Sequence, residues 1–152
     1  MSVNVPRGGS RGLKLPRFLG RLGNRMILRQ FRKGGARTQG GLETLMLETV
    51  GARSGEPRQA VLGFLPDGEN AWIVVAAMAG AARNPGWLHN LAAHADATVQ
   101  FDDGRRVAVR AETLEGADLA AAWERLERDA PEFPKYRTKT DREMSIVRLR
   151  RR

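Results

Sequence analysis

The sequence predicts a mainly β protein of the α+β class, in which about six antiparallel strands form a barrel or roll. Six short runs of strand-forming residues are joined mostly by tight connections. A longer helix is expected after the fifth run, and a short helix between the third and the fourth. No Gly-x-Gly-x-x-Gly follows a strand, which argues against a dinucleotide-binding parallel sheet. A chain of 152 residues is enough for one domain with its own core.

The basic charge is concentrated at the two ends of the chain. Residues 1–40 hold ten Lys or Arg and no Asp or Glu, whereas residues 41–152 hold 16 basic and 17 acidic residues. We therefore expect a basic N-terminal arm at 1–40 that seeks an anionic partner, and a separate domain at 41–152 that does not. The chain has no cysteine, which excludes disulfides, thiol nucleophiles and thiolate metal sites.

The N-terminal arm has two parts. Residues 1–12 are rich in Gly, Ser and Arg, and this composition predicts disorder. Residues 13–31 carry an apolar stripe at helical spacing, interleaved with arginines, which predicts an amphipathic helix. The stripe consists of Leu15, Phe18, Leu19, Leu22 and Met26. Residues 13–33 could lie on an anionic membrane or dock on their own domain, and we favour neither. A nucleic-acid partner is the weaker hypothesis because few aromatic residues accompany the charge.

The elements of the domain follow a glycine-rich connector at 34–41. Strands are expected at 42–50, 59–66, 71–77, 97–101, 105–113 and 145–149. The run 71–77 is apolar on both faces and should be the most buried strand. Asp102-Asp103-Gly104 predicts a hairpin turn. Helices are expected at 86–94 and 118–129, and Pro131 and Pro134 should break the second helix.

The loop at 51–58, Gly-Ala-Arg-Ser-Gly-Glu-Pro-Arg, is the stretch around which the domain is organised. Gly51 and Gly55 allow backbone conformations that other residues resist. Arg53, Ser54 and Arg58 supply donors, and a ring of backbone N–H groups and guanidinium suits phosphate. Spacing alone favours the plainer alternative, an ordinary polar hairpin turn.

Four pieces in this order resemble the deazaflavin (F420)-dependent nitroreductase and quinone reductase family. They are residues 49–58, Asp67-Gly68, the run Ala-Ala-Arg-Asn-Pro-Gly-Trp-Leu-His-Asn-Leu at 81–91, and Tyr136 followed by Thr140-Asp141-Arg142. The resemblance covers residue 42 to the C-terminus. It implies an FMN-binding-like split β-barrel that uses reduced 8-hydroxy-5-deazaflavin, coenzyme F420, to reduce a small lipophilic acceptor such as a quinone, enone or nitro compound. It also favours a cytoplasmic enzyme, at the inner face of the plasma membrane if the arm binds lipid.

The resemblance also assigns site residues. The loop with Arg53, Ser54, Gly55 and Arg58 would hold the phosphate and acidic tail of the cofactor. Further cofactor positions are Val61, Ala77, Met78, Trp87 and Asn90. The family often has a Ser-Lys pair where this chain has Ala77-Met78, so two polar groups are missing, and Arg83 is the candidate substitute. From the residues alone, Trp87 would be a core residue and Asn90 a surface or capping residue.

Tyr136 is the single tyrosine of the chain. The resemblance places it on the substrate side of the deazaflavin ring, where a phenol could hydrogen-bond the acceptor oxygen. The alternative is a tyrosine that packs under residues 131–134. Asp141-Arg142 is interpreted as a structural ion pair or helix cap. His89 and His94 are five residues apart and no Glu completes a triad, so no metal site is expected.

The competing hypothesis is a binding module without turnover. The missing Ser-Lys pair makes this alternative conceivable, with FMN or a lipid as the ligand in place of F420. Barrels of this kind are often dimeric, which makes a homodimer a further expectation of the resemblance.

Overall fold

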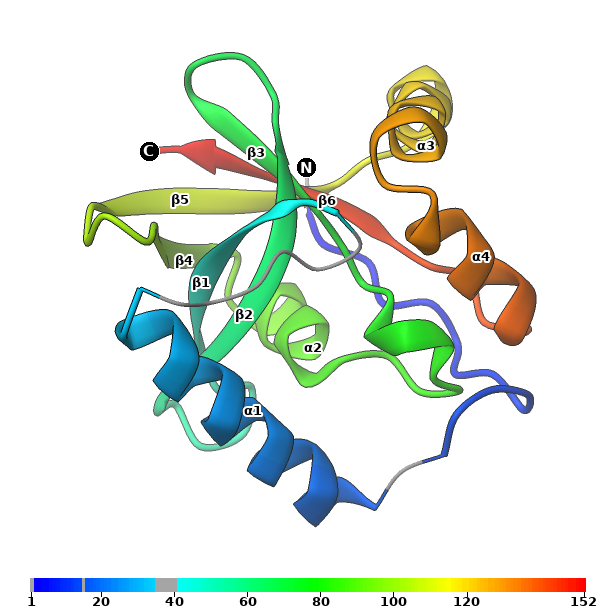
Figure 1. The fold of residues 1–152 in the computed structure, drawn as a ribbon, viewed down its shortest axis with the longest axis horizontal. Coiled ribbons are helices and arrows are strands. Elements are labelled where there is room, and N and C mark those ends of the chain that lie inside the picture. The colour runs from blue at the N-terminus through cyan, green and yellow to red at the C-terminus, as the bar shows by residue number, and fades with distance from the viewer. Residues whose placement is uncertain (1, 15, 35–40) are drawn as a thin grey trace.

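The computed structural model describes residues 2–14, 16–34 and 41–152, and in it six antiparallel strands form a barrel (Figure 1). The strands follow one another around the barrel in the order β1-β2-β3-β6-β5-β4, and β4 pairs back onto β1. The expected mainly β architecture with six antiparallel strands is confirmed. Their bounds are β1 Glu43–Val50, β2 Pro57–Pro66, β3 Ala71–Val75, β4 Asp96–Gln100, β5 Arg106–Thr113 and β6 Ile146–Arg151.

The amphipathic helix expected in the arm is α1, Arg17–Arg32, the two helices expected in the domain are also present, and two further helical elements were not expected. The helices expected at 86–94 and 118–129 are α2, Gly86–Ala93, and α3, Gly116–Asp129. The additions are a short 3₁₀ turn η1, Met78–Gly80, and α4, Glu132–Lys139. Helix α3 ends at Asp129, just before Pro131, as expected, but Pro134 does not break a helix. Pro134 falls in the first turn of α4, where a backbone N–H has no intrahelical acceptor to lose.

The core lies partly inside the barrel and partly between the barrel and α3 with α4. Every residue of β3 is buried, as expected for the run that is apolar on both faces. Leu45, Val74, Val99 and Leu149 are among the residues that fill the interior. A second cluster joins β3 and β6 to α3, whose Leu126 is fully buried. The two helices of this cluster lie side by side along one flank of the barrel (Figure 1).

The barrel is weakly closed between β2 and β3. β2 pairs with the whole of β1 through its residues from Pro57 to Phe64, but it meets β3 only at Leu65 and Pro66. Helix α1, Arg17–Arg32, crosses β2 on the side left open (Figure 1). Asn24 of α1 donates a side-chain hydrogen bond of 2.8 Å to the Gln59 carbonyl of β2. The helix therefore covers a strand edge that β3 does not pair.

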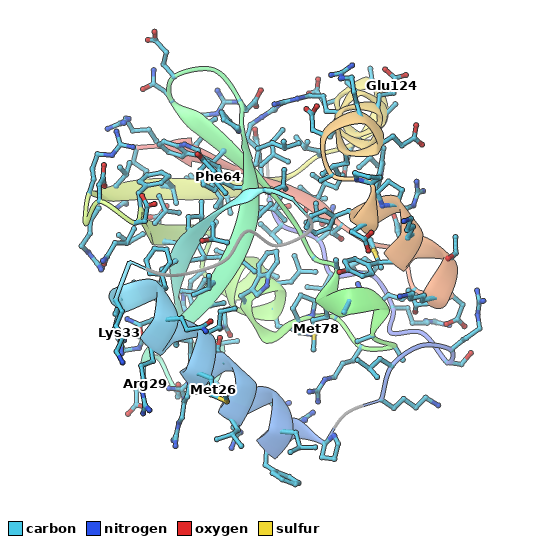
Figure 2. The ribbon with its side chains drawn as sticks, viewed as in Figure 1. Met26, Arg29, Lys33, Phe64, Met78 and Glu124 are labelled. Atoms are coloured by element: carbon cyan, nitrogen blue, oxygen red, sulfur yellow. The ribbon has the colours of Figure 1, made fainter. Side chains whose placement is uncertain are left out.

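Helix α1 docks through residues other than its predicted stripe. Leu28 and Phe31 are buried against Met46 of β1 and Val61 of β2. The stripe residues Phe18, Leu19, Leu22 and Met26 are exposed instead, and Leu15 lies outside the described residues. Figure 2 labels Met26 on α1, outside the barrel. An exposed apolar stripe therefore runs along a helix that contains basic but no acidic residues.

The expected disorder at the N-terminus is wrong for residues 2–12. This segment lies extended across the domain, with Val3 buried in the barrel core. The Gly9 N–H donates to the Ala82 carbonyl at 2.6 Å, and Leu13 and Ala81 form a parallel bridge. Glycine is required at Gly12, whose φ is +134° and whose missing Cβ would collide with the Gly80 carbonyl oxygen. The glycines that suggested disorder allow this close approach.

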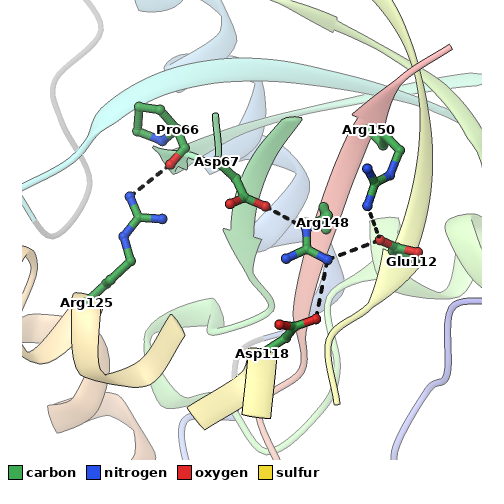
Figure 3. A network of polar contacts seen from close by, with 7 residues as sticks. All are labelled: Pro66, Asp67, Glu112, Asp118, Arg125, Arg148 and Arg150. Atoms are coloured by element: carbon green, nitrogen blue, oxygen red, sulfur yellow. Dashed lines mark hydrogen bonds and ion pairs between the residues drawn. The ribbon is translucent and has the colours of Figure 1, made fainter. Parts of the chain in front are cut away.

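An ion-pair network ties β6 to its neighbours (Figure 3). The Arg148 guanidinium lies 2.6 Å from an Asp67 carboxylate oxygen and 3.3 Å from a Glu112 oxygen. Asp118 of α3 lies 3.7 Å away on the same guanidinium. The half-buried Arg148 therefore links the β2–β3 turn, β5 and α3.

Candidate functional site

The loop after β1 is a compact turn held by its own backbone. The Gly51 N–H donates to the Glu56 carbonyl at 2.8 Å, and the Gly55 N–H donates to the Gly51 carbonyl at 2.9 Å. The Ser54 hydroxyl oxygen accepts from the Glu56 N–H at 3.2 Å and from the Arg58 guanidinium at 3.3 Å. A Cβ at Gly51 would lie 2.5 Å from that oxygen, so a larger residue there would displace the Ser54 hydroxyl from these contacts.

Arg53 of the loop and Arg58 at the start of β2 are accessible to a ligand. Arg58 is exposed and forms a loose ion pair with Glu56 at 3.6 Å. Arg53 is exposed, and within the described residues its side chain has no hydrogen bond or ion pair. An exposed ion pair contributes little to stability, so exchanging Glu56 for an anionic ligand costs the fold little.

Asn90 of α2 anchors this loop. Its side-chain oxygen accepts from the Ala52 N–H at 3.0 Å, and its side-chain NH₂ donates to the Thr49 hydroxyl at 3.0 Å. Thr49 is only 2 % exposed. Asn90, which the resemblance assigns to the cofactor site, thus contacts the loop, whereas Thr49, its buried partner, was not identified as a site residue.

The turn after β3 has a left-handed backbone. Ala77 is in the right-handed helical region, and the φ angles of Met78, Ala79 and Gly80 are +44°, +52° and +80°. The Ala77 side chain is buried in the core, while Met78 is 37 % exposed (Figure 2). Two consecutive non-glycine residues at positive φ are energetically costly, so their surroundings must hold them there.

Arg142 fixes this turn by hydrogen bonds to its backbone carbonyls. The residue is 4 % exposed, and its guanidinium donates to the carbonyls of Ala76 at 2.9 Å, Ala77 at 2.9 Å and Ala81 at 3.0 Å. It also donates to the side-chain oxygen of Asn84 at 3.0 Å. Burial lowers the pKa of Arg142. All of these acceptors are neutral, so the described residues offer this buried cation no carboxylate.

The expected Asp141–Arg142 ion pair is absent from the described residues. Asp141 instead accepts from the Ser10 hydroxyl at 2.6 Å and from the Arg11 N–H at 2.8 Å. The Ser10 hydroxyl and these backbone N–H groups lower the pKa of the Asp141 carboxyl. The two neighbours thus have separate tasks, because Asp141 binds the N-terminal segment and Arg142 binds the turn.

Tyr136 lies on α4, which packs against the same turn. A Cβ at Gly80 would lie 3.1 Å from the Tyr136 carbonyl oxygen and 2.8 Å from Lys139 Cβ, so glycine allows the two elements to touch. The Tyr136 ring is half-buried and meets Phe133 edge-on at 5.8 Å. Its hydroxyl makes no hydrogen bond within the described part of the chain.

The remaining candidate residues are less accessible. Trp87 is buried in the barrel core, as the residues alone suggested. Val61 is buried under α1 beside Leu28 and Phe31. Arg83 reaches α1, since a Cβ on Gly20 would lie 3.6 Å from its guanidinium.

Neither a metal site nor a membrane-spanning helix is found in the described ranges. No group of three His, Cys, Asp or Glu among these residues could hold a metal ion. No helix among them has the length and hydropathy to cross a bilayer.

Comparison with known proteins identifies the class and then the family. The closed barrel of six antiparallel strands is that of the split-barrel class, to which the F420-dependent reductases among its structural neighbours belong. A family model described as F420H(2)-dependent quinone reductase matches residues 21–150. An F420H(2)-dependent quinone reductase of Mycobacterium tuberculosis is 34 % identical over 121 residues, which cover 78 % of this chain and 80 % of the relative. The chain belongs to the F420H(2)-dependent quinone reductase family, as its motifs predicted.

Solved structures agree with this assignment. An F420-H2 dependent reductase (FDR-A) superposes with a TM-score of 0.62 at 27 % identity, over 70 % of this chain and 92 % of that one. A structure described as a domain-swapped dimer superposes with a TM-score of 0.64 at 25 % identity, over 89 % and 99 %. The expected split β-barrel is confirmed.

Proposed function

We propose that this protein binds coenzyme F420 and transfers a hydride from its reduced form to a small lipophilic acceptor, foremost a quinone. Enones and nitro compounds are acceptors of the same electrophilic kind. The observation that carries the proposal is the cationic corner loop, in which the Arg53 side chain has no partner among the described residues and the exposed Arg58 has only long contacts, 3.3 Å or more, to Ser54, Pro57 and Glu56. A phosphate with an acidic tail needs bidentate guanidinium and backbone donors of this kind.

The residues present fit such a cofactor. Arg53, Ser54, Gly55 and Arg58 would hold its anionic part, and Asn90 would fix the loop that carries them. The cofactor supplies the hydride, and the protein binds it, orients it and keeps water from the ring. Ala77 and Trp87 support the site from the core, and Met78 presents an apolar side chain at its surface. Val61 would support the binding site of the deazaflavin ring indirectly, because it packs against α1 and holds that helix on β2.

Tyr136 is the residue we assign to the acceptor. Its hydroxyl has no hydrogen-bond partner within the described residues, so it is available to donate to an acceptor oxygen as negative charge develops there. Replacing it by Phe should therefore lower turnover more than cofactor affinity. An equal loss in both quantities would assign Tyr136 to packing.

The experiment measures F420 binding by fluorescence quenching, and menadione-dependent oxidation of the reduced cofactor by absorbance. The double change Arg53→Ala and Arg58→Ala should weaken F420 binding by a factor of about 100 if each removes one charge-assisted hydrogen bond. The control pair, Arg110→Ala and Arg128→Ala, removes two exposed arginines outside the loop. Unchanged F420 affinity in the folded loop variant would refute the assignment.

We further propose that α1 brings the enzyme to an anionic membrane surface at the inner face of the plasma membrane. The support is its exposed apolar stripe flanked by arginines. Deleting residues 1–40 is a poor test, because residues 2–14 also hold the domain. The changes Phe18→Ser, Leu22→Ser and Met26→Ser leave those contacts intact. They should abolish co-sedimentation with anionic vesicles, and neutral vesicles are the control. Equal co-sedimentation of the parent and the variant would refute this proposal.

A binding module without turnover is the second candidate, and the apolar pair Ala77-Met78 favours it. F420 binding without menadione-dependent oxidation would support the module, and tighter binding of FMN than of F420 would indicate a flavin protein. We also propose a homodimer, because one structural neighbour is described as a domain-swapped dimer. Light scattering after size-exclusion chromatography measures the mass directly, and a value equal to the 16.8 kDa chain would refute the dimer.

A further inference from the structure

A cavity of about 260 Å³ lies at the end of the barrel opposite the 51–58 loop. Its buried wall consists of the aromatic side chains Phe64, Trp72 and Phe101. Glu43, at the start of β1, pairs with Phe64 near the end of β2 and lines the same cavity (Figure 2 labels Phe64). The loop follows the other end of β1, about 23 Å along the strand. A small ligand in this cavity would therefore not contact the loop.

The aromatic wall of the cavity already binds a cation of the chain itself. Phe101 meets Phe64 edge-on at 5.7 Å and Trp72 at 5.2 Å between ring centroids, so the three rings form one surface. The Arg105 guanidinium lies 4.6 Å from the centroid of Phe101. The face of an aromatic ring attracts a cation electrostatically. The Arg105 side chain makes no hydrogen bond or ion pair in the described part of the chain, so this contact alone holds it there.

The cavity is acidic, although the whole chain has a net charge of +9. Among the described residues that line it, Glu43, Asp102 and Asp103 are anionic and only Arg105 is cationic. Asp103 accepts from the Arg105 backbone N–H at 2.9 Å, whereas the carboxylates of Glu43 and Asp102 have no described hydrogen-bond or ion-pair partner. These acids do not form a group of three that could hold a metal ion. Together with the aromatic wall, they favour an organic cation over a divalent metal.

Thr44 supplies a hydroxyl to the same cavity. The residue is 8 % exposed, and its hydroxyl has no hydrogen-bond partner among the residues that the structure describes. No side-chain polar atom of these buried residues is both sealed from solvent and unpartnered, so the Thr44 hydroxyl is still reached by solvent. A hydroxyl oxygen accepts hydrogen bonds from ammonium and guanidinium groups. It is a polar acceptor that a ligand with N–H groups would satisfy.

We propose that this cavity binds a small organic cation, a protonated amine or guanidine, which displaces Arg105 from the face of Phe101. The cation would lie on that ring, and its N–H groups would donate to the carboxylates of Glu43 and Asp102 and to the Thr44 hydroxyl. The proposal goes beyond the reductase activity and does not depend on F420, because the loop assigned to the cofactor lies at the other end of the barrel.

Agmatine is the probe, because it carries one guanidinium and one ammonium group. In ¹⁵N–¹H NMR spectra of the full chain, it should shift the indole N–H signal of Trp72 and the amide signals of residues 101–105 saturably. Mg²⁺ is the control of equal charge. It keeps most of its water shell and makes no close contact with the rings, so it should bind at least about tenfold more weakly. Neutral butylurea should give no saturable shift. Equal affinity of agmatine and either control, or no saturable shift with agmatine, would overturn the proposal.

Two double variants test the carboxylates. Glu43→Gln with Asp102→Asn removes two exposed charges from the cavity and should weaken agmatine binding about tenfold. The control, Glu124→Gln with Glu127→Gln, removes two exposed charges from α3, outside the cavity (Figure 2 labels Glu124). Its agmatine affinity should stay within about twofold of the parent. Equal losses in the two double variants would show a general attraction to acidic protein and would overturn the site.

Single variants test the hydroxyl and the displacement of Arg105. Thr44→Val keeps the shape of the side chain and should weaken agmatine binding about two- to tenfold. Arg105→Ala should strengthen it about two- to fivefold, because agmatine no longer competes for the face of Phe101. Arg106→Ala removes the same charge at the next residue, outside the cavity, and should change the affinity less than about twofold. Unchanged or weaker binding in Arg105→Ala, or an equal gain in Arg106→Ala, would overturn the proposal.

Discussion

Asn90→Ala tests how far the position of the cofactor loop depends on one side chain. The change removes the acceptor of the Ala52 N–H and the donor to the Thr49 hydroxyl. Ala52 is exposed, so water can replace its partner, and that loss costs about 0.5–1.5 kcal/mol. Thr49 is buried, and its unpaired hydroxyl costs a further 1–3 kcal/mol or so. We therefore expect the free energy of unfolding to fall by about 2–4 kcal/mol.

Urea unfolding followed by tryptophan fluorescence measures this loss. Thr49→Val provides the partner change, because it removes the buried hydroxyl and keeps the shape of the side chain. The double variant has no Thr49 hydroxyl and therefore no unpaired buried group. Its loss of unfolding free energy should be about 1 kcal/mol smaller than the sum of the losses in the two single variants. Strict additivity of the two changes, or a loss below about 0.5 kcal/mol for Asn90→Ala, would refute the anchoring role.

Three further predictions concern stability. Phe31→Ala should lower the free energy of unfolding by about 3–5 kcal/mol and speed hydrogen exchange in α1, because Phe31 is 2 % exposed. The control Phe18→Ala, at an exposed position, should change it by no more than about 0.5 kcal/mol. Equal losses in the two variants would contradict the docking of α1. The lowered pKa of Asp141 means that its hydrogen bonds to Ser10 and Arg11 stabilise the fold fully above about pH 3.8 and weaken as the pH falls further. The protection factors of these two amides, which are exchange rates corrected for the intrinsic rate at each pH, should fall on acidification in the parent and be low at every pH in Asp141→Asn. Protection factors that do not change with pH in the parent would contradict this. Arg148→Met should lower the free energy of unfolding by about 3 kcal/mol in urea titrations, because Glu112 loses one of its two cations; a change within about 0.5 kcal/mol would show that the network adds no stability.

Local sequence patterns predicted the barrel because each strand is marked by the residues of its own short stretch and of the turn beside it. Alternating apolar residues and the Asp102-Asp103-Gly104 turn define β4 and β5 within a few residues. Helix α4 was missed because Pro134 was interpreted as a helix breaker, although proline is tolerated in a first turn. The resemblance assigned Asn90 to the cofactor site, but neither it nor the residue type predicted the hydrogen bonds of Asn90 to Ala52 and Thr49.

Long-range contacts account for what the sequence did not predict. Nothing in the residue types of Met78 and Ala79 signals a positive φ, because their left-handed backbone depends on Arg142, more than 60 positions away in the chain. The order of residues 2–12 likewise depends on Asp141 and on the backbone near Ala82. A composition rich in glycine does not distinguish a free tail from a segment packed closely on its own domain.

The short β2–β3 pairing has a consequence for solubility. Among the described strands, β3 pairs with β2 only at Leu65 and Pro66, and α1 packs against the rest of β2. An uncovered edge of this length is a template for pairing with another chain. A change that detaches α1 from the barrel, such as Phe31→Ala, should therefore have two effects. It should release the helix, and it should promote self-association through the exposed edge of β2.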